Sequence, residues 1–156
     1  MDAIKLQCDL LRETRKAPYG LGRMHEMRSE HYYIADEKGT ALYRIPVCEW
    51  YLSENSFSTP AGLPKAIVDM CQLTDDDLPL QKTGLVKEYN KEKYHVLAFE
   101  DGTNVYLDVK LATYFSKYVT YYKTKKPGMI KCVEREEVVA LIGEYIFKGG
   151  ARNDRI

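Results

Sequence analysis

The sequence lacks the marks of several large classes of protein. Its four cysteines, Cys8, Cys48, Cys71 and Cys132, lie far apart and form no C-x-x-C pair, so neither a disulfide framework nor a zinc ribbon is indicated. No apolar run approaches the roughly 20 residues that cross a bilayer, and no early apolar run resembles a signal peptide. These absences predict a cytoplasmic protein with free thiols and no membrane partner.

An excess of charge of either sign is also lacking. The 156 residues include 23 basic and 23 acidic side chains, so the net charge is zero. A neutral chain has no overall field that attracts nucleic acid. Binding to DNA must therefore come from a local patch of lysines or arginines.

No complete metal-binding motif is present. The segment from His25 to His31 reads H-E-M-R-S-E-H, and an H-E-x-x-H zinc motif needs its second histidine where Ser29 stands. The remaining spacing of six residues places the two histidines on different faces of a helix. We therefore expect a solvated approach to the next hairpin and no metal.

Catalytic signatures are lacking as well. Cys8 and Cys71 fall on apolar faces of predicted helices and Cys132 falls in a predicted core strand, where thiols are inert. The acidic run 75–77 follows a predicted helix, as solvated turns do. The sequence predicts a non-catalytic protein without a cofactor.

Hydrophobic periodicity predicts an α+β fold in which helices lie on one face of an antiparallel sheet. Residues 1–147 are expected to form a single domain, and the glycine-rich, charged residues 148–156 a flexible tail. The predicted helices are 2–16, 63–73 and 108–119, and the predicted strands lie in a hairpin at 29–47, a hairpin of 82–89 with 94–99, a short strand at 105–107, and a meander of 120–125, 129–134 and 138–147.

The two longer predicted helices have recognisable inner faces. In helix 2–16 Ile4, Cys8 and Leu11 share a stripe with Ala3 and Leu10, with Gln7 on the solvent side. In helix 108–119, Asp108 stands at the N-cap and Phe115 lies at the centre of the apolar face. Phe115 is therefore predicted to be buried beneath the sheet.

The two halves of the chain repeat one order of elements, a helix followed by antiparallel strands. The segment 33–45, Tyr-Ile-Ala-Asp-Glu-Lys-Gly-Thr-Ala-Leu-Tyr-Arg-Ile, resembles the stretch of bacterial sliding clamps in which a strand runs into an Asp-Gly-His-Arg-Leu type turn. The segment 105–147 is similar to the closing half of a clamp domain. This resemblance implies a DNA sliding-clamp-like fold with two clamp-like halves, each a helix covering strands.

The chain departs from the clamp pattern in three ways. Glu37 and Lys38 separate Asp36 from the glycine of the turn, Thr40-Ala41 replaces His-Arg, and only one domain's length is present where a bacterial clamp subunit has three. The chain also resembles small proteins of phages and other mobile elements.

Two functions remain open. Lysines interleaved with aromatic residues contact phosphates and stack bases, which favours a clamp-like accessory of DNA replication or recombination that assembles as a homo-oligomer. The same lysines also occur on edge strands that are protected against aggregation. The predicted DNA-binding residues are Lys110, Lys117, Lys123, Lys125 and Lys126.

The second function is that of a mobile-element inhibitor which binds a host protein complex acting on DNA, such as a defence complex. Thirteen tyrosines accompany one tryptophan and four phenylalanines, and exposed tyrosine is favoured at protein interfaces. The predicted partner-binding residues are Trp50, Tyr51, Phe57, Tyr121 and Tyr122.

Overall fold

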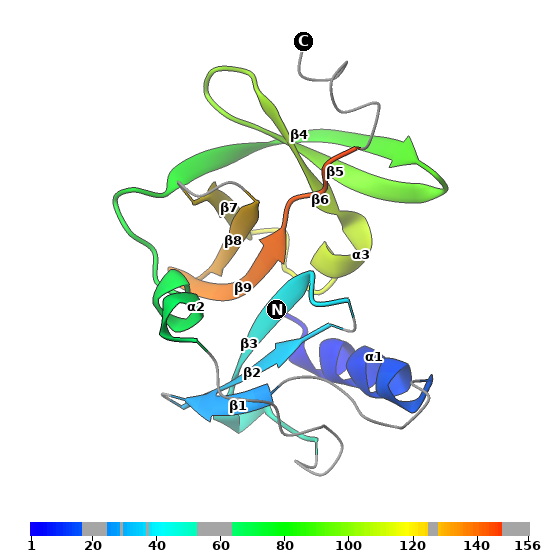
Figure 1. Cartoon of the computed structure of the whole chain (residues 1–156), viewed down its shortest axis with the longest axis vertical. Helices are drawn as coiled ribbons and strands as arrows, with labels where there is room; N and C mark the ends of the chain where they lie inside the picture. The colour runs from blue at the N-terminus through cyan, green and yellow to red at the C-terminus, as the bar shows by residue number, and fades with distance from the viewer. Residues whose placement is uncertain (17–24, 29, 37, 53–63, 125–127, 148–156) are drawn as a thin grey trace.

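The computed structural model describes residues 1–16, 25–28, 30–36, 38–52, 64–124 and 128–147 (Figure 1). The predicted tail therefore lies outside the described residues. The elements are α1 (Ala3–Lys16), β1 (His25–Arg28), β2 (His31–Ala35), β3 (Ala41–Pro46), the 3-10 turn η1 (Val47–Glu49), α2 (Lys65–Met70), β4 (Leu78–Tyr89), β5 (Glu92–Ala98), β6 (Asn104–Asp108), α3 (Val109–Ala112), β7 (Thr120–Lys123), β8 (Met129–Glu134) and β9 (Glu137–Gly143).

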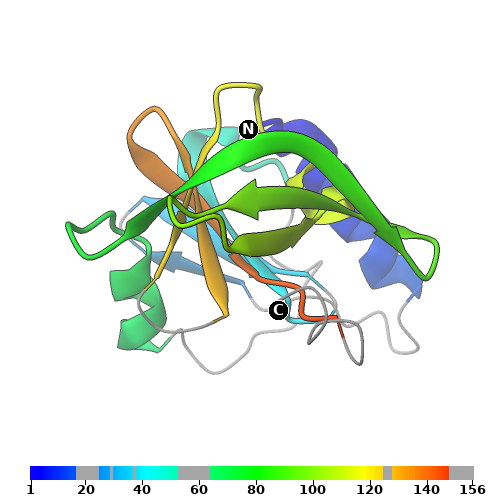
Figure 2. The same ribbon diagram turned by 90° about the horizontal axis from the view of Figure 1, so that it is seen from above.

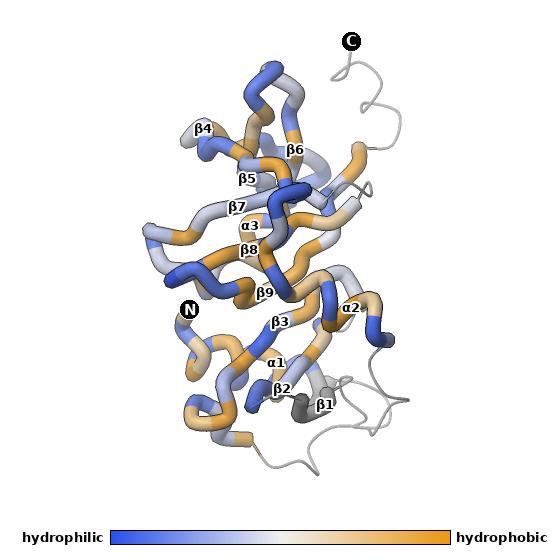
Figure 3. Tube along the Cα trace, turned by 90° about the vertical axis from the view of Figure 1, so that its left-hand side faces the viewer, coloured by the Kyte–Doolittle hydropathy of each residue, from blue (hydrophilic) through white to orange (hydrophobic). Residues whose placement is uncertain are grey.

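All described strands belong to one nine-stranded sheet in the order β1-β2-β3-β9-β8-β7-β4-β5-β6. Every pairing is antiparallel, so the α+β class and the antiparallel sheet are confirmed. The most hydrophobic stretches of the trace lie in β8 and β9, near the middle of the sheet (Figure 3). The core is therefore built on the central strands.

Helices cover both faces of the sheet, so the prediction that they lie on one face is wrong. Side chains of consecutive strand residues point to opposite faces. On β2, Ile34 packs in the cluster that contains the buried residues of α1, whereas Tyr33 packs in a second cluster beneath α2. The short helix α3 contributes Ala112 to the α1 side.

The order of elements is repeated about the centre of the sheet. Helix α1 precedes strands β1 to β3, and helix α3 precedes strands β7 to β9. The last strands of the two sets, β3 and β9, pair with each other, with Ala41 opposite Ile142 and Tyr43 opposite Ala140. The β4–β5–β6 meander, which the two-halves interpretation does not contain, lies beyond β7.

Helix α1 forms where expected, but its buried face differs from the prediction. Ala3 and Leu10 are buried as predicted, but Leu6 and Gln7 are buried too. Ile4 and Cys8, which were predicted to face inward, are exposed. Gln7 lies on the inner face because its side-chain amide finds hydrogen-bond partners there for both its nitrogen and its oxygen. Its Nε2 donates to the Ala3 carbonyl at 2.9 Å and to the Glu49 carbonyl at 2.7 Å, and its Oε1 accepts the backbone N–H of Tyr51 at 2.8 Å.

Helix α3 begins as predicted but ends after one turn. The Asp108 carboxylate accepts the Lys110 N–H at 2.9 Å, which is the expected N-cap. The backbone N–H of Ser116 then donates to the Glu134 carboxylate at 2.7 Å, so it makes no helical bond to a preceding carbonyl. Phe115 is consequently only half-buried. The predicted three-turn helix is therefore wrong.

A buried ion pair connects β8 with the segment between α2 and β4. Lys131 Nζ lies 2.8 Å from Asp77 Oδ2, and both side chains are 4% exposed. Lys131 also donates to the Gln72 carbonyl at 2.7 Å, and the Thr74 N–H donates to Asp77 at 2.8 Å. The Asp77 side chain is thus buried in an ion pair, contrary to the prediction that the run 75–77 is solvated, whereas Asp75 and Asp76 are exposed as predicted.

The chain beyond β9 closes the far end of the sheet. The N–H of Tyr145 donates to the Tyr106 carbonyl of β6 at 2.9 Å. Phe147 is 1% exposed, and its ring is surrounded by those of Tyr89, Tyr94, Tyr106 and Tyr145, with centroid distances of 5.1, 5.2, 4.7 and 4.8 Å. We call these four tyrosines the aromatic box.

Candidate functional site

The middle of β4 is a long exposed stretch of the sheet. All six residues from Gln81 to Val86 are exposed, including Leu85 at 64% and Val86 at 52%. Figure 2 shows β4 as a long curved strand that runs across the molecule above β5 and β6. Such exposure is unusual for a strand within a sheet, because at least one face is normally covered.

A β-bulge causes this exposure. Lys82 pairs with Leu97 and Val86 with His95, so β4 advances 86 − 82 = 4 residues while β5 advances 97 − 95 = 2. Gly84 occupies the left-handed region with a φ of 75°, which glycine adopts without strain. The two extra residues carry the chain away from the ladder.

The bulge has its own hydrogen bonds. The Thr83 hydroxyl donates to the Val96 carbonyl at 2.6 Å and accepts the Leu85 N–H at 3.1 Å. These bonds replace ladder contacts that the extra residues interrupt. The bulge is therefore held in a defined conformation.

A groove with a volume of about 520 Å³ lies between the bulge and the loop that joins α3 to β7. Its apolar surface comes from both sides, with Leu85 and Val86 on the bulge and Phe115 on the loop. Tyr121 is buried in its floor. We call this the bulge groove.

The charges of the bulge groove have one sign. Lys82 and Lys117 line it together with His95, and no carboxylate lines it among the described residues. Lys82 Nζ donates to the Lys117 carbonyl at 3.1 Å and lies 5.8 Å from the centroid of the Tyr121 ring. Burial, and secondarily the charge of Lys82, lower the pKa of His95 below its ordinary value. The groove is thus suited to a ligand that is both apolar and acidic.

The predicted DNA-binding lysines do not gather on one face as far as they are described. Lys117 lines the bulge groove, whereas Lys110 lies on α3 with its Nζ 2.9 Å from Glu92. Lys123 is mostly buried and pairs with Glu144 at 3.1 Å. Lys125 and Lys126 lie outside the described residues.

The predicted partner-binding aromatics are also separated. Trp50 is half-buried and stacks on Tyr32 with a centroid distance of 4.3 Å, and Tyr51 beside it is exposed. Tyr122 packs in the cluster beneath α2, on the opposite face from Tyr121. Phe57 is outside the described part of the chain.

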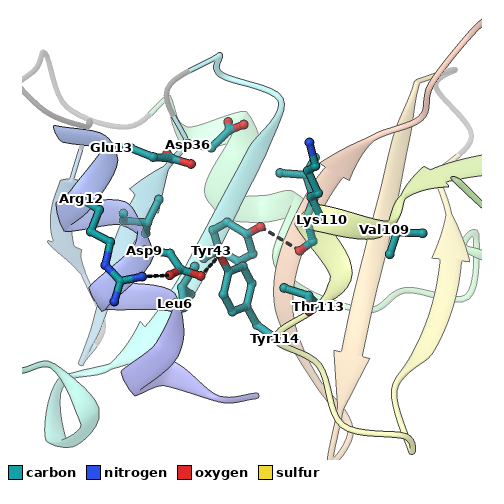
Figure 4. A pocket seen from close by; sticks show the side chains of 12 residues that line it. Leu6, Asp9, Arg12, Glu13, Asp36, Tyr43, Val109, Lys110, Thr113 and Tyr114 are labelled. Carbon is teal, nitrogen blue, oxygen red and sulfur yellow. Dashed lines mark hydrogen bonds and ion pairs between the residues drawn. The ribbon is translucent and has the colours of Figure 1, made fainter. Parts of the chain in front are cut away.

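A second hollow, of about 430 Å³, lies between α1, β3 and α3 (Figure 4). Its polar groups are bonded to one another. The Tyr114 hydroxyl donates to Asp9 at 2.8 Å, the Arg12 guanidinium lies 3.4 Å from the same carboxylate, and the Tyr43 hydroxyl donates to the Leu111 carbonyl at 2.8 Å. Burial raises the pKa of Tyr43, so its hydroxyl stays protonated. This hollow is a structural junction between the helices.

Neither the histidines nor the cysteines form a site in the described structure. Where side chains are described, no three His, Cys, Asp or Glu residues are grouped to hold a metal ion. Cys8 is exposed, contrary to the prediction, and Cys48 is exposed too. Cys71 and Cys132 are buried, and burial raises the pKa of the Cys71 thiol to about 11.

The important residues of the bulge groove, Lys82, Leu85, Val86 and His95, were absent from the predicted site. The sequence carries one signal for it, because a glycine inside a strand pattern often marks a bulge, and Gly84 is such a glycine. No sequence signal places Lys117 beside the bulge, because only the tertiary fold brings these two segments together.

Comparison with known proteins yields no matching family model, no matching curated protein and no matching solved structure. Within the described residues, no helix combines the length and apolar character needed to cross a membrane. The candidate function therefore rests on the geometry of the bulge groove.

Proposed function

We propose that this chain is a non-catalytic binding protein that holds an acidic segment of a partner protein in the bulge groove. The observation that carries the proposal is the exposed pair Leu85 and Val86 on a hydrogen-bonded bulge, beside Lys82 and Lys117. Large apolar side chains gathered at an exposed groove are typical of interaction sites. Lysines at the rim select the charge of the partner.

This proposal corresponds to the partner-binding function, in which the chain inhibits or regulates a host protein complex. The clamp-like function needs a basic face on the helices to hold DNA. The charges that line the hollow between α1 and α3 are mixed, since Asp9 and Glu13 lie there with Arg12 and Lys110. Lys123 is also paired with a carboxylate, so among the described lysines of that predicted face two, Lys110 and Lys123, have their charge compensated by a glutamate.

A peptide selection tests the proposed function. A library of random peptides displayed on phage is selected against the immobilised protein, and the enriched peptides are then synthesised and titrated. We expect the enriched peptides to combine Asp or Glu with aliphatic residues. Their binding should weaken roughly tenfold or more in the double variant Lys82→Glu/Lys117→Glu, because two attractions become repulsions.

The matched control is Lys38→Glu/Lys110→Glu, which changes the net charge equally at exposed positions outside the groove. Its affinity for the peptides should stay within about twofold of the parent. Leu85→Ser should weaken binding without a change in charge, because it removes apolar contact. Equal loss in the control double variant would contradict a specific groove.

DNA is titrated beside the peptides at low and high salt. Binding of DNA with a strong salt dependence, lost in Lys82→Glu/Lys117→Glu, would identify the groove as a nucleic-acid site and overturn the protein-partner proposal. The expected result is no salt-dependent binding of single- or double-stranded DNA.

A further inference from the structure

Among the described strands, none pairs with one edge of β4 for most of its length, and we call this the open edge. On one side, β5 pairs with Gln81 and Lys82 and again from Val86 to Tyr89. On the other side, β7 pairs only with Leu78, Pro79 and Leu80. Beyond Leu80, no described strand pairs with this second edge. Where the ladder with β5 is regular, from Val86 to Tyr89, the backbone N–H and C=O groups of alternate β4 residues are directed away from β5.

The open edge and the bulge groove adjoin one another. Lys82, Thr83 and Val86 of this part of β4 line the groove, and the opposite wall is the loop between α3 and β7. An extended chain in the groove would therefore lie alongside β4. Strand edges bind extended peptides through main-chain hydrogen bonds, with side-chain pockets providing selectivity.

Resting on the proposed function, we propose further that the partner segment is an acidic β-strand that pairs with the open edge of β4. Its apolar side chains lie against Leu85 and Val86, and its carboxylates face Lys82 and Lys117. A second copy of this chain is a poor occupant, because pairing two β4 edges brings the lysines of both copies together.

The competing explanation is that the bulge and Lys82 protect an exposed edge from pairing. Bulges and lysines serve that purpose in many sheets. That explanation predicts no binding at this edge. It also predicts that Lys82→Glu/Lys117→Glu changes only the tendency to aggregate.

The probe is a short synthetic peptide in which Glu alternates with Val. Two further peptides carry N-methyl groups on every second residue, on the Glu set in one and on the Val set in the other. A β-strand uses the N–H groups of alternate residues for each edge. One methylated peptide should therefore bind roughly tenfold or more weakly than the parent peptide, and the other within about twofold.

Hydrogen exchange measured by NMR gives a second readout. Peptide binding should slow the exchange of those β4 amides from Gln81 to Tyr89 that face away from β5. The amides that already face β5, and the Leu85 amide that donates to Thr83, should change little. Lys82→Glu/Lys117→Glu should remove the effect, and Lys38→Glu/Lys110→Glu should retain it.

The outcomes separate the two proposals. Equal loss from both methylated peptides, or groove binding without protection of β4 amides, would overturn strand addition and leave the groove as a side-chain site. Failure of the Glu-Val peptide to bind would overturn strand addition as well. The proposed function itself would be overturned by a library selection that yields no groove-dependent peptide, or by the groove-dependent DNA binding described above.

Discussion

Phe147 should contribute more to stability than Phe115, although Phe115 lies at the centre of the longest apolar pattern in the second half of the sequence. Phe147 is 1% exposed within the aromatic box, and Lys87 Nζ lies 4.4 Å from its ring centroid. Phe115 is half-buried and makes looser contacts, 6.5 Å from Tyr43 and 6.5 Å from Tyr121 between ring centroids. The two phenylalanines therefore form a matched pair for one substitution.

The expected magnitude follows from burial. Phe147→Ala removes a fully buried ring and leaves a cavity, at a cost of about 3–5 kcal/mol in the free energy of unfolding. Phe115→Ala removes a ring that already contacts solvent, so its cost is about 1–2 kcal/mol. For a chain of this size, 1 kcal/mol corresponds to a shift of roughly 2–4 °C in the thermal midpoint. The midpoint should fall by roughly 6–20 °C in Phe147→Ala and by roughly 2–8 °C in Phe115→Ala.

Urea denaturation followed by far-ultraviolet circular dichroism, with thermal melts alongside, measures both variants. Tyr118→Ala serves as a surface control, because this side chain is exposed and should change stability by less than about 0.5 kcal/mol. A loss in Phe147→Ala equal to or smaller than that in Phe115→Ala would refute the assignment of the closing contact to Phe147.

Two further predictions concern buried charges and protonation. Asp77→Ala should cost about 3–5 kcal/mol in urea titrations because it strands the Lys131 ammonium in the core, and Asp77→Leu/Lys131→Met should recover most of that loss. His95 has a pKa held below its ordinary value of 6.5 by burial and then by Lys82. As pH falls, the unfolded chain takes up a proton at His95 before the folded chain does. The stabilisation of the folded state is therefore full above about pH 6.5, and the free energy of unfolding declines below that pH. His95→Gln should therefore flatten the change in unfolding free energy between about pH 7.5 and about pH 5.5, and an unchanged slope would contradict the burial of this imidazole.

Features set by neighbouring residues were predictable from the sequence. The hairpin of β2 and β3 forms where expected because the Asp36 carboxylate accepts the N–H groups of Thr40 at 2.7 Å and Ala41 at 2.9 Å. Gly39 supplies the left-handed conformation with a φ of 68°. The hairpin of β4 with β5 and the N-cap of α3 were also predicted correctly, because they too depend on residues that are close in the sequence.

Features set by distant residues were not predictable. The end of α3 depends on Glu134, which takes the Ser116 N–H, and the inner face of α1 depends on Gln7, which bonds to Glu49 and Tyr51. The hydrophobic periodicity of a helix carries no information about such distant hydrogen-bond partners. The candidate site has the same limit, because Gly84 marks the bulge locally but only the folded chain brings Lys117 opposite Lys82.

Strand β9, the last of the described strands, has a consequence for the order of folding. Strand β3 pairs with β9, and Ala41 and its partner Ile142 are 142 − 41 = 101 residues apart. During synthesis, the hairpin of β2 and β3 must therefore wait for almost the whole chain before its inner edge is paired. Contacts of such long range slow folding and leave apolar strands open in the meantime. Shortened chains that end before β9 should accordingly aggregate as they emerge from the ribosome, whereas chains that include β9 and Phe147 close the centre of the sheet and the aromatic box in the same late step.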